Sequence, residues 1–395
     1  MRAFLLAALL FSACGDDSSD DRPLDAATED ASDDSDAGVS CTCRGPGTCA
    51  RVAGSPQCTC DEGFERLLAT RCVPEGGPID PGYALPVQGF GREATGGAGG
   101  TTVEVTDYGD DGAGTLRQRL RDASGPTVVR FVRDGTIALE GSALLVPSNV
   151  TLDARGVDVR LTGFGLRLEG VENVVVLNLA FVDIDDSTGG DGIQMIGARD
   201  VAVLHCRFDN GGLDFLPDIP DEQISVVAGS RDITIAWSAF RHHDKVMLLG
   251  NGDSPELDRE LRVTLYANLF EETGRRHPFM RSGRVDMFNS IVRDWNVRLE
   301  GFGAYGSRAE ADGELLLEAN LYDQSDSTQP FAALTLDGDG RLRLVDNVLA
   351  QRFLVVSDRE PETVFTRPYP ATVHPMTDRL VAAIEAGAGN TVPAP

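Results

Sequence analysis

Short apolar runs rich in Val, Ile and Leu recur along the middle of the chain and are separated by Gly, Asn and Asp. Runs of this length between turn-forming residues are typical of β-strands. The clearest are residues 128–132, 174–179, 201–204, 233–237 and 262–265. Helical periodicity is scarce, and residues 116–122 give the best match to a short helix. The pattern therefore predicts an all-β fold.

An internal repeat orders these strands. Residues 197–201 recur as residues 229–233, which lie 32 positions later. The strands that follow end in aromatic residues, and the same spacing continues once more: Phe208, Phe240 and Phe270. An Asn also recurs two residues before an apolar or aromatic position, at Asn268, Asn289, Asn320 and Asn347. Asn at one place in successive coils can form a ladder of hydrogen-bonded amides.

The repeat favours a parallel β-helix over a sandwich or a propeller, since the sequence lacks paired hairpin turns and blade signatures. Successive coils lie about 4.8 Å apart, so residues one repeat apart become neighbours. Lys245 and Arg276 are 31 positions apart, and Asp191 and Asp221 are 30 apart. If each offset is one coil, the two cations are adjacent and so are the two carboxylates. Arg281 follows Arg276 by five residues.

These residue types point to two kinds of chemistry. Paired carboxylates suit calcium, which prefers several oxygen ligands. Adjacent cations suit the carboxylates of a polyanionic substrate. Each residue alone is more simply a turn residue or an ion-pair partner, but the joint spacing favours a site. The formal net charge of -27 argues against nucleic acid as the partner, because phosphate binding needs a basic surface.

The N-terminus is a targeting signal that takes no part in the fold. An apolar run at residues 3–11 is too short to span a bilayer. Residues 11–14 resemble a bacterial lipobox, with Phe11 in place of the usual Leu, so we expect a signal peptide at 1–13 and lipidation of Cys14. An ordinary secretory signal is the alternative.

Residues 14–40 are rich in Asp, Ser and Ala and predict a solvated, disordered tether. We therefore expect an exported protein, either an outer-membrane or cell-surface lipoprotein or a secreted one. The lipid anchor would be its only membrane contact, and we expect a monomer.

Six cysteines crowd into a short stretch that predicts a disulfide framework: Cys41, Cys43, Cys49, Cys58, Cys60 and Cys72. A thiolate metal site is the alternative. Residues 58–64 resemble the C-x-C-x-x-G-F end of an epidermal-growth-factor-like module, here residues 41–73. That resemblance implies first-to-third, second-to-fourth and fifth-to-sixth pairing. A linker at 74–86 follows, and the isolated Cys206 lies in a strand pattern typical of a buried, inert thiol.

The large domain carries a series of motifs in order, at residues 89–91, 95–100, 105–107, 112–117, 135–137, 190–193, 233–238, 243–245 and 276–278. Through them the chain resembles the polysaccharide lyase family 1 pectate lyases. The resemblance implies a right-handed parallel β-helix over residues 87–357. It also implies β-elimination on polygalacturonate: the C6 carboxylate is neutralised, the C5 proton is removed and the C4–O bond breaks.

The same resemblance assigns roles to the candidate residues. Arg276 matches the general base of the R-x-P-x-x-R motif, Lys245 the lysine that binds the galacturonate carboxylate, and Arg281 a second substrate-binding arginine. Asp191 and Asp221 match ligands of Ca²⁺. Because guanidinium is protonated in water, a base role requires Lys245 and calcium to lower the proton affinity of Arg276. The other role open to Arg276 is to stabilise the anion.

One departure bears on the metal. The family's D-x-x-x-D calcium pattern ends here in Ser225, which should weaken resting calcium binding unless Glu222 or Asp218 compensates. We expect a calcium-assisted pectate lyase. The alternatives are a calcium-independent pectin lyase, whose relatives have aromatic-rich grooves, and a surface carbohydrate-binding β-helix without activity. The only tryptophans are Trp237 and Trp295.

Several other polar residues have simpler interpretations. Leu204 replaces the family's Asp before His205, and we interpret that histidine as a packing or hydrogen-bonding residue. His242 and His243 are interpreted as structural, since adjacent strand residues face opposite ways. Asp244 is expected to orient Lys245 or a turn. Residues 358–395 form a C-terminal extension whose Pro/Ala-rich end predicts loose order.

Overall fold

The computed structural model describes residues 41–81, 85–185, 190–211, 221–252, 255–295, 305–324, 332–351, 355–356 and 363–394. The expected signal peptide, the expected lipidation site Cys14, the expected tether and Asp218 lie outside these ranges. Within them, no helix combines the length and the apolar character needed to cross a membrane.

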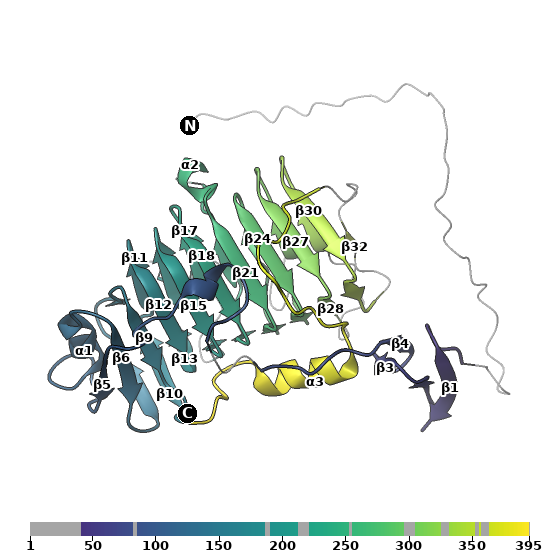
Figure 1. Ribbon diagram of the computed structural model, residues 1–395, viewed down its shortest axis with the longest axis horizontal. Helices are drawn as coiled ribbons and strands as arrows, with labels where there is room; N and C mark the ends of the chain where they lie inside the picture. The colour runs from purple at the N-terminus through teal and green to yellow at the C-terminus, as the bar shows by residue number, and fades with distance from the viewer. Residues whose placement is uncertain are drawn as a thin grey trace, which may run out of the picture. The chain divides into compact units, whose positions relative to one another are not determined.

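Three parallel sheets form a β-helix, because each coil contributes one strand to each sheet and pairs with the next coil (Figure 1). Sheet 1 contains β5 (Thr101–Val105), β6 (Thr127–Phe131), β9 (Val150–Asp153), β12 (Glu172–Leu177), β15 (Arg199–Leu204), β18 (Arg231–Ala236), β21 (Arg262–Tyr266), β24 (Arg284–Phe288), β27 (Glu314–Glu318) and β30 (Arg341–Val345).

Sheet 2 contains β7 (Gly135–Ala138), β10 (Val159–Gly163), β13 (Leu179–Ile184), β16 (Arg207–Asp209), β19 (Ala239–Arg241), β22 (Leu269–Glu271), β25 (Ile291–Arg293), β28 (Leu321–Asp323) and β31 (Val348–Leu349). Sheet 3 contains β8 (Leu144–Leu145), β11 (Leu166–Glu169), β14 (Ile193–Ile196), β17 (Ile224–Val227), β20 (Met247–Leu249), β23 (Phe279–Met280), β26 (Tyr305–Ala309), β29 (Ala332–Leu336) and β32 (Val355–Val356). The expected parallel β-helix is confirmed.

Short helices accompany the coils. The predicted helix is α1 (Leu116–Asp122), whose first turn is capped by the hydroxyl of Thr115. The 3-10 helix η1 (Phe90–Glu93) lies on sheet 1, where the N–H groups of Phe90 and Gly91 donate to threonine hydroxyls of β21 and β18. A further turn of helix, α2 (Pro255–Asp258), precedes β21.

Inward-facing side chains stack from coil to coil, as the repeat predicted. The rings of Phe181, Phe208, Phe240 and Phe270 follow one another at centroid distances of 4.7, 4.9 and 4.9 Å. All four rings are buried in the interior. Offset stacking of this kind adds a specific attraction to the burial of apolar surface. The rings therefore fix the register of sheet 2.

The predicted amide ladder exists, but its members differ from those expected. Each side-chain oxygen accepts a backbone N–H of the coil before it, through Ser238, Asn268, Ser290, Asn320 and Asn347. The inclusion of Asn289 was wrong. Phe270 pairs with Val292, so the residue level with Asn268 is Ser290. Asn289 instead bonds the backbone of His374.

The cysteine-rich module contains two hairpins, β1 (Gly47–Val52) with β2 (Ser55–Cys60) and β3 (Phe64–Leu67) with β4 (Arg71–Pro74). Its disulfides are Cys41–Cys49, Cys43–Cys58 and Cys60–Cys72. This is the expected pairing, and it excludes a thiolate metal site at these six cysteines. Asp378 accepts hydrogen bonds from the side chain of Arg66 and the backbone of Leu68, which joins the module to the C-terminal helix.

The prediction of loose order at the C-terminal end was wrong. Residues 378–387 form α3 (Asp378–Gly387), which is capped by Thr377 and buries Leu380 and Ile384 (Figure 1). The Pro- and Ala-rich composition concealed this helix. Upstream of it, Arg367 pairs with the buried Asp286 of β24.

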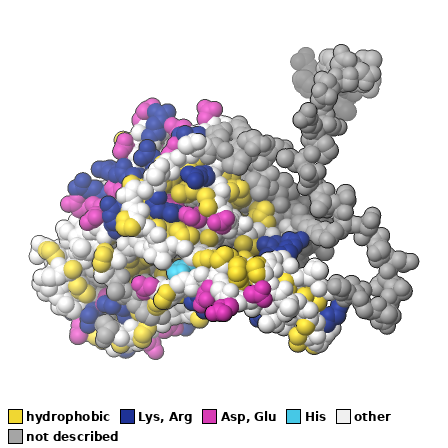
Figure 2. Space-filling view, turned by 45° about the vertical axis from the view of Figure 1, so that its right-hand side comes forward, with side chains coloured by type: hydrophobic (Ala, Val, Ile, Leu, Met, Phe, Trp, Pro, Cys, Tyr) yellow, Lys and Arg dark blue, Asp and Glu magenta, His cyan; other side chains and the backbone are white. Residues whose placement is uncertain are grey.

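Charged side chains of both signs are intermixed on the face shown in Figure 2, rather than separated into patches. Pairs between successive coils account for part of this mixture. Arg262 of β21 donates two hydrogen bonds of 2.8 Å to Asp232 of β18, and Arg199 of β15 pairs with Glu172 of β12. The Arg199–Glu172 pair is exposed, and exposed pairs contribute little stability individually.

One such contact predicts a pH effect on stability. The two ring nitrogens of His242 each lie 2.8 Å from a carboxylate, that of Asp209 and that of Glu272. Although burial acts in the opposite direction, these carboxylates raise the pKa of His242. The stabilisation is fully present below the unfolded pKa, about 6.5, and is lost as the pH rises through the folded pKa. Replacing His242 by Gln should cost up to about 1 kcal/mol more at pH 5.5 than at pH 9. Thermal unfolding checks this, and equal losses at the two pH values would contradict it.

Candidate active site

The candidate residues gather at the turns that lead into sheet 3. Asp191 precedes β14, Asp221 precedes β17, Lys245 precedes β20 and Arg276 precedes β23. Arg281 directly follows β23. Parallel strands of one sheet begin at the same edge, so residues before successive strands become neighbours. The winding of the chain thus brings the predicted cations and acids together on one side of the solenoid.

Three carboxylates form an acidic cluster. Asp191, Asp221 and Glu222 each place one oxygen within 4.8 Å of the others. Ile193 pairs with Ile224, so the residue level with Asp191 is Glu222. The expected alignment of Asp191 with Asp221 is therefore wrong by one residue, although both belong to the cluster. Glu222, considered only as a compensating ligand, is a central member.

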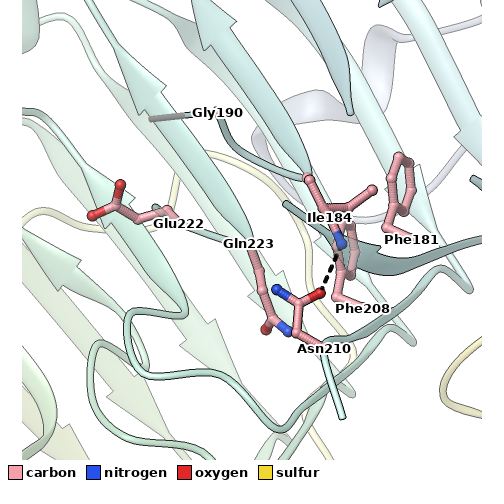
Figure 3. Close-up of a pocket in the computed structure, with 8 residues that line it drawn as sticks. Phe181, Ile184, Gly190, Phe208, Asn210, Glu222 and Gln223 are labelled. Carbon is pink, nitrogen blue, oxygen red and sulfur yellow. Dashed lines mark hydrogen bonds between the residues drawn. The ribbon is translucent and has the colours of Figure 1, made fainter. Parts of the chain in front are cut away.

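The side chains of the adjacent residues Glu222 and Gln223 point in different directions (Figure 3). The carboxylate of Glu222 points away from the small pocket formed by Phe181, Ile184, Phe208 and Asn210, whereas the side chain of Gln223 points toward Asn210. The Gln223 amide donates to the carbonyl of Arg241 at 2.9 Å. This hydrogen bond fixes the backbone just before β17, where the neighbouring residue Glu222 supplies the acid.

Asp191 and Glu222 are buried, so water solvates their carboxylates poorly. Burial raises the pKa of Asp191 to about 7, and the charge of Asp221 acts in the same direction. Burial also raises the pKa of Glu222 to about 8, although the charge of Arg276 opposes it. Buried carboxylates with raised proton affinity are incompletely compensated by nearby cations. Their hard oxygen donors fit a divalent cation such as calcium.

Ser225 occupies the place where an acid was expected. Its hydroxyl donates a hydrogen bond to the Asp191 carboxylate. The serine thus orients one acid of the cluster in place of contributing another, while Glu222 supplies the third carboxylate. The backbone carbonyl of Asp221 is held by the ring of His243, whose other nitrogen contacts Asn210. His243 is structural, as predicted.

The cations pair with the acids. Lys245 donates to Asp221 at 2.7 Å, and Arg276 donates to Glu222. Although burial acts in the opposite direction, the hydrogen bond to Asp221 raises the pKa of Lys245, which keeps the amine protonated. The cluster is therefore a network of alternating charges, in which each cation is held by an acid.

The expected alignment of Lys245 with Arg276 is also wrong by one residue. Lys245 is bridged to Arg275, whereas three residues later Leu248 pairs with Phe279. An extra residue is therefore accommodated between these two pairs. Arg276 lies within this bulge and has a φ of 73°, a left-handed conformation that is unfavourable for a residue with a side chain. Such strain is common where a bulge directs a functional side chain. Asp244 pairs with Arg275, so it orients the turn.

Arg281 differs from the other cations in its partners. One of its guanidinium nitrogens donates to the carbonyl of Asn251 at 2.7 Å, and its guanidinium lies 4.8 Å from the Phe279 ring centroid. Within the described ranges it forms no ion pair with an acid. An arginine that lacks a carboxylate partner is suited to take one from a ligand.

The remaining candidates lie outside this cluster. The His205 ring bonds two carbonyls, of Gly387 at 2.9 Å and Pro81 at 2.7 Å, which confirms a structural role. Cys206 is a buried free thiol, and burial raises its pKa to about 12. Trp237 and Trp295 are buried, so neither forms an exposed aromatic surface.

Comparison with known proteins gives the family. A family model described as pectate lyase matches residues 135–390. The chain belongs to the pectate lyase family. It is 30% identical over 294 residues to "Probable pectate lyase 18" of Solanum lycopersicum, across 68% of this chain and 70% of the relative. The expectation of a polysaccharide lyase is confirmed at the level of the family.

Solved structures of other proteins share the fold. Jun a 1, the major allergen of cedar pollen, matches with a TM-score of 0.63 and 25% identity over 77% of this chain and 92% of its own. A pectate lyase from Bacillus sp. N165, solved in complex with trigalacturonate, matches with a TM-score of 0.60 and 20% identity over 77% of this chain and 98% of its own.

Proposed function

We propose that this protein cleaves α-1,4-linked polygalacturonate by calcium-assisted β-elimination and releases 4,5-unsaturated oligogalacturonates. One observation carries the proposal: a three-carboxylate cluster interlocks with Lys245 and Arg276, with Arg281 nearby, in a member of the pectate lyase family. The pectate lyase from Bacillus sp. N165, which has a similar fold, was solved in complex with trigalacturonate, a short piece of the proposed substrate.

Asp191, Asp221 and Glu222 would hold the calcium, because their oxygens lie close together and their buried charge is not fully compensated. A bound calcium would supply positive charge for the substrate carboxylate. Two of these acids also hold the cations in place, since Asp221 holds Lys245 and Glu222 holds Arg276. The acidic cluster therefore serves both to bind the metal and to position the cations.

The cations of this chain perform the rest of the reaction. Lys245 and Arg281 bind the uronate carboxylate and withdraw electron density from C5, which makes the C5 proton more acidic. Arg276 either accepts that proton or stabilises the carbanion that its loss creates. The electron pair of the C5–H bond forms the second bond between C4 and C5. The C4–O electron pair leaves with the glycosidic oxygen, which takes up a proton from water as the other half of the chain is released.

The structure gives less support to the alternative of a calcium-independent pectin lyase. That alternative rested on the missing acid at Ser225, and Glu222 supplies a third carboxylate in the same cluster. Both tryptophans are buried, so neither offers an aromatic groove. A carbohydrate-binding β-helix without activity is an outcome of the assay below.

We also propose that residues 41–73 are an epidermal-growth-factor-like module, which the three disulfide pairs support. The export signal and lipidation of Cys14 are proposals of the same kind. Their support is the sequence of residues 1–14.

The assay uses polygalacturonate at alkaline pH, where an unsaturated product raises the ultraviolet absorbance. We expect activity that a chelator abolishes and that added calcium restores. Replacing Asp191 by Asn should raise the calcium concentration needed for half-maximal rate by at least about tenfold. The control Asp200→Asn, in sheet 1, should leave it unchanged. Activity on methyl-esterified pectin with chelator present would favour the pectin lyase, and no product from either substrate would favour the binding protein.

A further inference from the structure

Outward-facing residues form a row across sheet 3 beside the acidic cluster. The strand register places one residue of each coil in this row: Ser225, Leu248, Phe279, Arg308 and Thr335. Their strand neighbours Val226, Leu249, Met280 and Ala309 face inward and are fully buried. The row includes Ser225, which donates a hydrogen bond to Asp191. From there it leads along the solenoid axis past Arg276 and Arg281. A polysaccharide bound at the cluster and extended along the axis would lie over it.

Phe279 is buried even though it faces outward. Its side chain is 5% exposed. Three guanidinium groups cover it, with centroid distances of 5.5 Å to Arg276, 4.8 Å to Arg281 and 5.2 Å to Arg308. The face of an aromatic ring carries partial negative charge and attracts cations at these distances. One ring thus gathers three like charges that would otherwise repel one another.

Arg308 has partners that a ligand can replace. It donates to Asp337 at 2.7 Å and lies 3.3 Å from Glu310. The side chain of Asp337 is 62% exposed, so water can solvate it when Arg308 turns to another carboxylate. The buried Nε of Arg308 has no acceptor among the described residues. This guanidinium therefore retains a capacity to donate.

We propose that Phe279 positions Arg276, Arg281 and Arg308 as one cationic arc, and that Arg308 forms a further subsite for a uronate carboxylate of the same polysaccharide. Successive coils lie about 4.8 Å apart, a step similar to the width of a sugar ring. Arg308 lies one coil beyond Phe279 and can meet the carboxylate of a neighbouring sugar. This inference rests on the proposed function, because it names how the same site holds a second sugar.

Three variants test the arc. Arg308→Gln removes the charge of the subsite and retains hydrogen-bonding capacity. Phe279→Leu retains an apolar side chain and removes the ring face. The third variant combines both substitutions. Arg160→Gln is the control, because it removes an exposed, ion-paired arginine from β10 in sheet 2. Thermal unfolding of each variant shows whether the fold is retained.

Kinetics on polygalacturonate separate the two roles. Arg308→Gln should raise KM about tenfold and leave kcat within about twofold, because it removes binding away from the reacting bond. Phe279→Leu should raise KM and also lower kcat about tenfold, since the ring supports Arg276. The double variant should resemble Phe279→Leu, because residues that act together have non-additive effects. The control should match the wild type.

The inference is overturned if a folded Arg308→Gln variant retains the wild-type KM, or if the two substitutions act independently. Calcium dependence should stay the same in Arg308→Gln, because Arg308 pairs with Asp337 and Glu310 and not with the acidic cluster, and a changed calcium requirement in that variant would also contradict the assignment. If the wild type yields no unsaturated product, the proposed function fails. Calorimetric binding of oligogalacturonate then decides: weaker binding by Arg308→Gln supports the subsite, whereas equal binding or none overturns it.

Discussion

Replacing Arg276 by alanine is expected to lower kcat on polygalacturonate by about 10³-fold or more, the combined scale of a lost proton acceptor and a lost anion-stabilising donor. Arg276 lies in a strained bulge, donates to Glu222 and lies against Phe279. Its side chain is held in place before substrate arrives. Alanine removes the group and leaves the buried carboxylate of Glu222 without its cation.

The measurement is the initial rate of unsaturated product formation at saturating calcium. Arg276→Lys distinguishes the two roles, since lysine retains a positive charge and changes the proton affinity. A large recovery with an altered pH profile would indicate proton transfer, and recovery with an unchanged profile would indicate anion stabilisation. Arg262→Ala, which removes an ion-paired arginine from β21, serves as the control and should remain fully active. Wild-type rates in Arg276→Ala would falsify the assignment.

Replacing Arg367 by alanine is expected to lower the free energy of unfolding by about 3–5 kcal/mol, because it leaves a buried charge without its partner. The side chain of Asp286 has no exposed surface. It accepts two hydrogen bonds from Arg367, at 2.6 and 2.9 Å, and one from the Tyr369 hydroxyl. Arg367 also pairs with Glu318 at 2.8 Å, so one substitution disrupts two ion pairs.

Urea denaturation followed by circular dichroism measures this loss. The control is Arg284→Ala in the same strand as Asp286, where the arginine is 55% exposed. An exposed pair of this kind contributes at most about 1 kcal/mol. Similar midpoints for the two variants would show that the C-terminal contact is unimportant. The activity of folded Arg367→Ala should be normal, because Arg367 packs on sheet 1 and the candidate site lies beside sheet 3.

The solenoid could be predicted from the sequence because its coils repeat inward-facing residues at similar positions. Phe208, Phe240 and Phe270 were identified as equivalent before any register was known, and they stack as expected. The disulfide pairing followed from a resemblance to a known module. The stacking of coils constrains all the phenylalanines together, and the fold of the module constrains all six cysteines together.

Alignment to a single residue could not be predicted, because the coils differ in length. The paired residues Val201, Ile233, Val263 and Val285 are separated by 32, 30 and 22 positions. A fixed repeat therefore misplaces neighbours by one residue, as it did for Glu222 and Arg276. The bulge at Arg276 adds a local offset that spacing alone does not reveal.

Other features gave no usable signal in the sequence. Phe279 occupies a variable position of R-x-P-x-x-R, and Arg308 belongs to none of the motifs that carried the resemblance. Phe279 and Arg308 occupy paired positions of two successive coils, and the arginine lies over the phenylalanine ring. This contact depends on how the coils stack, which no motif in the sequence reveals. The α3 helix was concealed by the Pro- and Ala-rich composition of the segment that contains it, and packing against the solenoid stabilises it.

The C-terminal segment changes how the solenoid should unfold. It bonds Arg341 through Thr363, Asn289 through His374, His205 through Gly387, and Gly156 through Val392. Repeat proteins whose units contact only their neighbours can melt from an end, one unit at a time. Here one returning segment of the chain bridges the coils between Gly156 and Arg341, so these coils cannot fray independently and should lose their structure in one cooperative transition.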